Sequence, residues 1–396
     1  MLQINTKTKL LCHYGPAKDK FSLGVLALSL MDNGEILIGA GDGTIALIKG
    51  ETFKKVRSTK LDGGITSLAC LSDSNFFTGT QLSQIFRVQL NDFSSKVIST
   101  CHYSSVKDIS FPYNYRDVFA TCSKNDIRVW NAKTSKELLR IIVPNMTCNA
   151  VEFMRDGKTI LSAWDDGKIR AYTPESGQMK YTIHDAHCKG VTALAATSNS
   201  KRIISGGGEG QVRVWDVIGK EYKMANAMKE HKGSVTSIKV RSKDSQCVTS
   251  SIDGTCIIWD LERFVRNQII FANTMFKVVC YRPDESQVIT AGTDRKIAYW
   301  EKYDGSIIRE LDGTKSGAIN GMDVSPDGNY FVTGGEDKLL KVWRYNEGEV
   351  THVGVGHSGE IMRLKICPAQ NHIVSVSADG AVLRWKFPFE MSENND

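Results

Sequence analysis

The sequence predicts an all-β fold: a β-propeller of seven blades, preceded by about two further blades. The first observation behind this prediction is a row of aromatic residues at a nearly constant interval. A repeat of about 40–45 residues that ends in an apolar run with tryptophan is typical of four-stranded propeller blades. The second observation is an acidic residue, usually aspartate, six residues before most of these aromatics. The row consists of Trp130, Tyr172, Trp215, Trp259, Trp300, Trp343 and Trp385.

The composition is ordinary for a globular protein, with 41% hydrophobic and 24% charged residues among 396. No segment reaches the roughly 18 consecutive apolar residues of a membrane helix, and Met1–Leu10 lacks the apolar core of a signal peptide. We therefore expect a reducing compartment and free thiols at the ten cysteines. The net charge of +6 is compatible with an acidic partner but is more typical of a charge that serves solubility.

The first units have weak signatures and no tryptophan. They occupy residues 1–94, and their first strands are expected near Leu26 and Ile65. Because two blades cannot close a ring, we interpret residues 1–94 as the remnant of a preceding propeller.

Residues 95–390 contain seven units and are predicted to form a complete propeller. The last unit ends at Pro388 with only three strands. Lys96–Cys101 is expected to supply its fourth strand, because such closure removes an open sheet edge. Residues 391–396 are expected to be a disordered tail. The first strands of the seven units are expected near Val106, Cys148, Val191, Val235, Phe276, Ile319 and Ile361.

The unit from His231 to Asp260 shows the repeated pattern most clearly. Alternating apolar and β-branched residues predict its strands, and the Asp253-Gly254 pair predicts a tight turn between two of them. A histidine stands four residues before the first strand, and it recurs in three other units.

This pattern resembles the WD-repeat family, whose blades carry a buried hydrogen-bond relay of His, Ser or Thr, Asp and Trp. Such a relay satisfies polar groups that would otherwise be buried without partners. Two units match the relay completely: His231, Ser251, Asp253 and Trp259, and His357, Ser377, Asp379 and Trp385.

Three units depart from the relay pattern. Lys124 stands in one unit where an aspartate is expected, and Gly207 and Gly335 stand where two others should have the hydroxyl. We expect those blades to depend on packing and to be locally softer.

Glycine-rich runs do not indicate a nucleotide site here. The runs at Gly39–Gly43 and Ser205–Gly210 join strand to strand, whereas a dinucleotide fingerprint needs a helix after the glycines. No catalytic or phosphate-binding motif occurs, and the aspartates form a row of turns. We therefore expect no enzyme activity, cofactor or small-molecule substrate. A dense basic stripe with interleaved aromatic residues is also missing, so no nucleic-acid partner is expected.

A group of residues at His184, Asp185, His187 and Cys188 suggests a metal site at first sight. However, His187 already fits the blade relay, and no second pair of ligands has zinc-type spacing. We expect no metal.

Several longer segments go beyond the general repeat pattern. Together they are similar to a family of cilia- and flagella-associated WD-repeat proteins that line the lumen of axonemal doublet microtubules. The resemblance extends over essentially the whole chain. The segments are Gly15–Val25 (GPAKDKFSLGV), Val143–Cys148 (VPNMTC), Phe153–Lys158 (FMRDGK), Thr293–Trp300 (TDRKIAYW), Tyr345–Gly359 (YNEGEVTHVGVGHSG) and Ser375–Trp385 (SVSADGAVLRW).

The resemblance implies a non-enzymatic microtubule inner protein. It would bind tubulin on the luminal wall of the B-tubule, contact other luminal axonemal proteins and support ciliary motility. That family has two seven-bladed propellers in tandem, so a chain that begins within the first propeller suggests a truncated form. The expected location is the cytoskeleton of the cilium or flagellum, with no membrane partner.

The alternative function is a cytosolic WD-repeat adaptor that scaffolds an unrelated complex. In either case partners are expected on the propeller face that carries the turns before the relay aspartates. The contact candidates on this face are Asp165, Thr293, Glu336 and Ala378.

Overall fold

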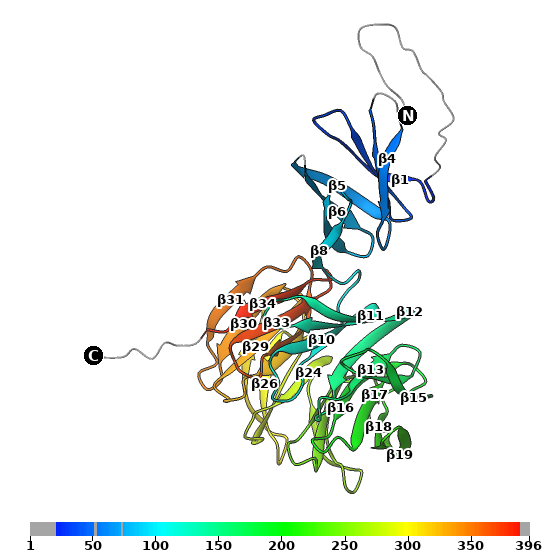
Figure 1. Cartoon of the computed structure of the whole chain (residues 1–396). Coiled ribbons are helices and arrows are strands. Elements are labelled where there is room, and N and C mark those ends of the chain that lie inside the picture. The colour runs from blue at the N-terminus through cyan, green and yellow to red at the C-terminus, as the bar shows by residue number, and fades with distance from the viewer. Residues whose placement is uncertain (1–20, 51–53, 73, 389–396) are drawn as a thin grey trace, which may run out of the picture. The chain divides into compact units, whose positions relative to one another are not determined.

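The computed structural model describes residues 21–50, 54–72 and 74–388 (Figure 1). Every regular element in these ranges is a β-strand, so the predicted all-β class is confirmed. No helix in the described ranges is long and apolar enough to cross a membrane. The tail predicted at 391–396 and the first 20 residues of the predicted remnant lie outside these ranges. The chain divides into two compact units between Tyr103 and Ser104.

The described part of the first unit contains two four-stranded antiparallel sheets. Their apolar faces pack together through buried residues that include Leu37, Ile65 and Phe76. Leu28 and Leu30 of β1 remain exposed. The strands are β1 (Val25–Leu30), β2 (Ile36–Ala40), β3 (Thr44–Ile48) and β4 (Lys55–Lys60), followed by β5 (Ile65–Ser72), β6 (Asn75–Thr80), β7 (Gln84–Gln89) and β8 (Ser95–Thr100).

The strand β8 does not close the second unit, so the prediction for Lys96–Cys101 is wrong. β8 pairs antiparallel with β7, with Lys96 opposite Arg87 and Val97 opposite Phe86. The division of the chain therefore lies after Tyr103, not at the predicted position between 94 and 95. An outer strand exposes most of its side chains, as β8 does. Its sequence pattern therefore predicts that it lies at the edge of a sheet, but not which of the two neighbouring sheets it joins.

The second unit is a series of antiparallel sheets that follow one another along the chain. Within each blade the strands follow one another from the inner strand outward, and the first two blades share one seven-stranded sheet. The first strands are β9 (Asp108–Ser110), β10 (Val118–Cys122), β11 (Lys124–Asn131), β12 (Glu137–Phe153), β13 (Ile160–Trp164), β14 (Ile169–Tyr172) and β15 (Met179–Ile183). Next are β16 (Val191–Ala196), β17 (Arg202–Gly207), β18 (Val212–Ile218) and β19 (Glu221–Met228), then β20 (Val235–Val240), β21 (Gln246–Ser251), β22 (Thr255–Asp260) and β23 (Val265–Phe271). The last are β24 (Phe276–Tyr281), β25 (Gln287–Gly292), β26 (Lys296–Glu301), β27 (Ile307–Asp312), β28 (Ile319–Val324), β29 (Tyr330–Gly335), β30 (Leu339–Arg344), β31 (Val350–Val355), β32 (Ile361–Ile366), β33 (His372–Ser377) and β34 (Val382–Lys386).

The strand β12 belongs to two blades. Its first half pairs with β11, and its second half pairs with β13. Between the two halves the chain passes through Pro144 and Asn145, and Asn145 has a positive φ of 60°. The two blades are thereby joined into one continuous sheet from β9 to β15.

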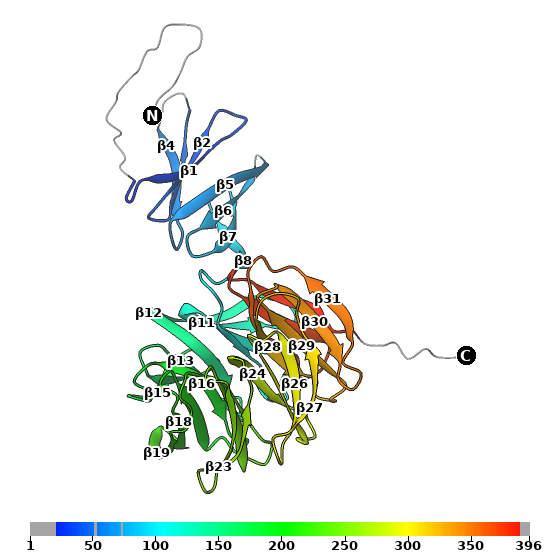
Figure 2. The same ribbon diagram turned by 180° about the vertical axis from the view of Figure 1, so that it is seen from behind.

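The sheets of the second unit form a closed ring, as Figures 1 and 2 show. Contacts connect the inner strands in the order β9, β12, β16, β20, β24, β28 and β32, and β32 in turn contacts β9. The Val106 N–H donates to the Ser377 carbonyl at 3.0 Å across this last junction, where Phe119 packs with Val374 and Val376. This arrangement is the β-propeller architecture that the aromatic repeat predicts.

Because β8 pairs with β7, its removal should not weaken the ring. We expect a fragment of residues 101–388 and a fragment of residues 95–388 to show thermal unfolding midpoints within about two degrees of each other. Circular dichroism of the two purified fragments measures this difference. A clearly lower midpoint for the shorter fragment would instead favour a closing role for Lys96–Thr100.

Candidate interaction site

The blade from β20 to β23 contains a buried relay around Thr249. The Trp259 indole N–H donates to Thr249 Oγ1 at 2.8 Å, and His231 Nε2 lies 2.7 Å from the same oxygen. His231 Nδ1 lies 2.7 Å from Thr255 Oγ1, which donates to Asp253 at 2.6 Å. The direct distance from His231 Nδ1 to Asp253 Oδ2 is 3.5 Å. The relay connects β21, β22 and the loop before β20.

The relay hydroxyl is therefore Thr249, and the prediction of Ser251 is wrong. Residues 249 and 251 point to the same face of β21, because side chains alternate along a strand. Only Thr249 lies within reach of the indole. Ser251 Oγ instead accepts the backbone N–H of Asp253 at 3.2 Å and so shapes the turn.

The last blade repeats this arrangement, and the prediction of Ser377 is wrong in the same way. Ser375 Oγ accepts the Trp385 indole N–H at 2.7 Å and lies 2.7 Å from His357 Nε2. His357 Nδ1 lies 3.4 Å from Asp379 Oδ2. Ser377 Oγ accepts the backbone N–H of Asp379 at 3.2 Å.

The blade with Gly207 also has its relay hydroxyl two residues earlier than predicted, so the prediction that this blade lacks the hydroxyl is wrong. Ser205 in that blade accepts the Trp215 indole N–H at 2.9 Å and lies 2.8 Å from His187 Nε2. Glu209 takes the place of the aspartate, 2.6 Å from His187 Nδ1. This blade therefore contains a complete relay and does not depend on packing alone.

The blade that contains Gly335 also has a hydroxyl for its indole. The Trp343 N–H donates to Thr333 Oγ1 at 2.9 Å, and Thr333 stands two residues before Gly335. The prediction that this indole lacks a hydroxyl partner is therefore wrong.

The blade with Lys124 replaces the aspartate by a buried ion-pair network. Arg128 is 1% exposed, and its guanidinium contacts Asp126 at 2.7 Å and Glu137 at 3.1 Å. The Trp130 indole still donates to a hydroxyl, that of Thr121, at 2.7 Å. This blade thus has polar connections of its own where packing alone was expected.

The environment of the relay keeps its histidines neutral and its carboxylates charged. Burial lowers the pKa of His231 from its ordinary 6.5 to about 4, although Asp253 opposes this shift. Burial likewise lowers the pKa of His187 and of His357. Burial acts to raise the pKa of Asp253, but the hydrogen bonds from Thr255 and from the Lys232 N–H outweigh it and lower the value.

Acid should destabilise the second unit through His231. Between about pH 6.5 and pH 4 the unfolded chain binds a proton on this histidine that the folded chain does not bind. Stability from this group is therefore complete above pH 6.5 and is lost as the pH falls towards 4, by on the order of 3 kcal/mol. In this window we expect His231→Gln to reduce the slope of unfolding free energy against pH by about 1.4 kcal/mol per unit. Urea unfolding at several pH values measures both slopes, and equal slopes would contradict the assignment.

Charged groups fill the centre of the ring. Lys365 Nζ contacts Asp323 at 2.7 Å, and Arg363 donates to the Thr236 carbonyl at 3.1 Å. Burial raises the pKa of Glu152, and repulsion by Lys365 together with burial lowers the pKa of Lys239. The cavity between these groups measures about 50 Å³. Drug-sized ligands need roughly 300 Å³ or more, and the contacts of Lys365 and Arg363 connect different blades across this space.

The four predicted contact residues occupy equivalent turns at one end of the strands. In each blade the backbone N–H of this residue donates to the carbonyl of the residue directly before the inner strand or, for Thr147, directly before the inner half of β12. The side chains of three of them also accept the backbone N–H of that same residue. Asp165, Thr293 and Glu336 are exposed, and Ala378 is half-buried. The donor–acceptor pairs are Asp165–Thr147 (3.0 Å), Thr293–Met275 (3.2 Å), Glu336–Ala318 (2.9 Å) and Ala378–Glu360 (2.9 Å).

The glycine-rich runs lie in the same kind of turn, between strands. Gly41 N–H donates to the Gly24 carbonyl and Gly208 N–H to the Gly190 carbonyl. Across residues 21–50, 54–72 and 74–388, no group of three or more His, Cys, Asp or Glu side chains could hold a metal ion.

One buried tryptophan that donates to a hydroxyl lies outside the regular row, so the repeat does not predict it. The Trp164 indole N–H donates to Ser162 Oγ at 2.7 Å in the blade whose row position holds Tyr172. The signal for it was the Ser-Ala-Trp alternation of β13, which places Ser162 and Trp164 on one face of the strand.

Comparisons with known proteins detect the same repeats. A protein-family model described as WD domain, G-beta repeat matches residues 177–216, 223–260, 305–344 and 348–386. The chain is 59% identical over 390 residues to the Mus musculus protein named Cilia- and flagella-associated protein 52. It is 57% identical to the Homo sapiens protein of that name and 44% identical to the Chlamydomonas reinhardtii one. Each match covers 98% of this chain and 63% of the relative, so the chain spans less than two thirds of their length.

Proposed function

We propose that this chain, which contains WD repeats and is similar over nearly its whole length to proteins named Cilia- and flagella-associated protein 52, is a structural protein of the axoneme. The observation that carries the proposal is this similarity, which extends from a mammal to an alga at 44% identity or more. The names of these relatives support localisation to the cilium or flagellum. WD repeats support a role in protein–protein interaction.

In more detail, the protein acts as a microtubule inner protein without enzymatic activity. It binds tubulin on the luminal wall of the B-tubule, together with neighbouring luminal proteins. Two observations agree with a scaffold. The relay groups are buried and hydrogen-bonded within blades, and the central cavity of about 50 Å³ is too small for most substrates. The exposed turns at Asp165, Thr293 and Glu336 supply a repeated surface for contact.

Extraction of the tagged protein from demembranated cilia tests this proposal. Weak contacts gain strength when they repeat along a polymer, so retention in doublets should exceed the affinity for free tubulin dimer. We expect moderate salt to leave the protein in the doublets, and disruption of the tubule wall to release it.

Variants of the contact turns sharpen the same experiment. Asp165→Ala, Thr293→Ala and Glu336→Ala combined should increase salt extraction without changing the thermal unfolding midpoint by more than a few degrees. Lys243→Ala is the matched control, since this exposed residue lies in the β20–β21 turn at the other end of the strands. Complete release of the unmodified protein at moderate salt, with tight binding to a soluble non-axonemal partner, would instead identify a cytosolic adaptor.

A further inference from the structure

The last blade of the second unit presents an open sheet edge. Among the described residues its sheet contains only β32, β33 and β34, and β34 pairs with β33 on one side. The Ala381 carbonyl and the Phe387 N–H bond towards β33. Because such bonds alternate along an antiparallel strand, the backbone groups of Val382, Arg384 and Lys386 point away from the sheet.

The open edge leaves the tryptophan of this blade incompletely covered. In the four-stranded blades an outer strand lies beside the equivalent tryptophan. Trp259 is opposite Arg266 of β23, and Trp343 is opposite Val350 of β31. Those two indoles are 1% and 4% exposed. Trp385 has no such neighbour in the described chain and is only half-buried.

The residue directly before the repeated aromatic residue also differs in the last blade. At this position the last blade has Arg384, whose side chain is exposed. The other blades of the second unit have a buried apolar residue there, namely Val129, Ala171, Val214, Ile258, Tyr299 and Val342.

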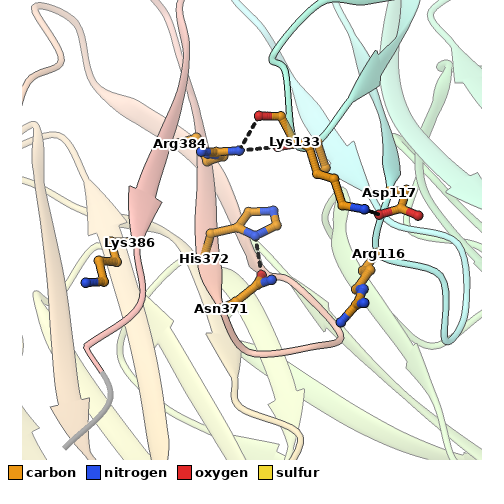
Figure 3. A pocket seen from close by; sticks show the side chains of 8 residues that line it. Arg116, Asp117, Lys133, Asn371, His372, Arg384 and Lys386 are labelled. Atoms are coloured by element: carbon orange, nitrogen blue, oxygen red, sulfur yellow. Dashed lines mark hydrogen bonds and ion pairs between the residues drawn. The ribbon is translucent and has the colours of Figure 1, made fainter. Parts of the chain in front are cut away.

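A basic pocket of about 460 Å³ lies beside β34, between the last blade and the first blade of the ring (Figure 3). Arg116, Lys133, Arg384 and Lys386 line it, against one carboxylate, Asp117. The Arg384 guanidinium is held in place by the Lys133 carbonyl at 2.8 Å. Lys133 Nζ contacts Asp117 at 3.1 Å, which leaves a positive excess of three charges in the pocket.

The pocket also contains a buried imidazole with an unused nitrogen. His372 is 8% exposed, and its Nδ1 is hydrogen-bonded to Asn371 Oδ1. Its Nε2 is buried and has no hydrogen-bond partner in the described structure. Figure 3 shows the ring lying among the cationic side chains. Since a buried polar atom is costly to leave unsatisfied, this nitrogen points to a polar occupant of the pocket.

We propose that β34 and the basic pocket bind an extended acidic segment of a partner protein. The segment adds to the edge as a fourth strand, and its main chain pairs with the free backbone groups of β34. Alternate side chains of a strand point to one face, so carboxylates at every second position enter the pocket opposite Arg384 and Lys386. This proposal stands on the edge and the pocket and does not depend on the axonemal role.

A synthetic peptide tests this binding mode with the full chain. The probe has about ten residues, with Glu at every second position and Thr or Val between them. We expect saturable binding by fluorescence anisotropy, and slower hydrogen exchange at the amides of Arg384 and Lys386. A peptide with Lys in place of each Glu should not bind. A peptide with Pro at two of the Thr or Val positions keeps its charge but cannot form the ladder, and it should bind at least about tenfold more weakly.

Charge reversal in the pocket provides the matched variants. Lys386→Glu should weaken binding of the acidic peptide at least about tenfold, because like charges then oppose each other. Arg266→Glu, at an exposed outer strand, should leave binding unchanged. Arg384→Glu tests the same charge effect. Because this variant also loses the hydrogen bonds to the carbonyls of residues 132 and 133, its thermal unfolding midpoint is measured to show that it is folded. Unchanged binding to Lys386→Glu, equal binding of the proline peptide, or full competition by inorganic phosphate at millimolar concentration would overturn the proposal.

Discussion

Replacing Trp259 by alanine should lower the free energy of unfolding of the second unit by about 3–5 kcal/mol. The indole is 1% exposed and lies in the apolar core of its blade with Val235, Ile238 and Cys247. Its removal leaves a large cavity. It also removes the donor to Thr249, so a buried hydroxyl loses one of its partners.

Two variants separate these contributions. Trp259→Phe keeps most of the apolar volume but loses the N–H, and we expect it to cost about half as much. Trp385→Ala should cost clearly less than Trp259→Ala, because the open edge of β34 already leaves Trp385 half-buried. Urea unfolding of residues 101–388 measures all three changes. Equal losses for Trp259→Ala and Trp385→Ala would falsify the link between the missing fourth strand and stability.

Replacing Arg128 by alanine should have an effect of similar size, about 3–5 kcal/mol. Arg128 is buried, and its guanidinium joins Asp126 and Glu137, so the substitution leaves two carboxylates without their cation and creates a cavity. Chemical denaturation of the same fragment measures the loss.

The conservative replacement provides the control for Arg128. Arg128→Lys keeps the charge but cannot contact both carboxylates through a planar fork, so we expect roughly half of the loss. Arg140→Ala removes a more exposed arginine that also contacts Glu137, at 2.7 Å, and should cost below about 1 kcal/mol. A small loss in Arg128→Ala would mean that packing, as the sequence suggests, holds this blade together.

The inner strands were predictable because each begins with a large apolar residue directly after a short loop. The expected starts at Val235, Phe276, Ile319 and Ile361 coincide with the first residues of β20, β24, β28 and β32. Each of these four first residues is at most 2% exposed, so burial of an apolar side chain marks the start of the strand.

Features that depend on partners distant in the sequence were not predictable in the same way. Thr249 and Ser251 share a strand face, and only the position of the indole across the sheet selects Thr249. The pattern of β8 fits an outer strand of either unit, and pairing with β7 decides between them. The ion-pair network around Arg128 was not predicted either. Lys124 shows that the relay aspartate is missing from this blade, but it does not show that Arg128 and Asp126 form an ion pair there.

The continuous strand β12 has a consequence for the chain under tension. Between most neighbouring blades the chain crosses a loop, such as residues 184–190 between β15 and β16, which can straighten when pulled. Only residues 143–146 lie between the paired parts of β12, so little chain is free to straighten there. A force that opens one of its blades is transmitted directly into the ladder of the other. The two blades should therefore extend together, in one step of about twice the contour length that a single blade releases.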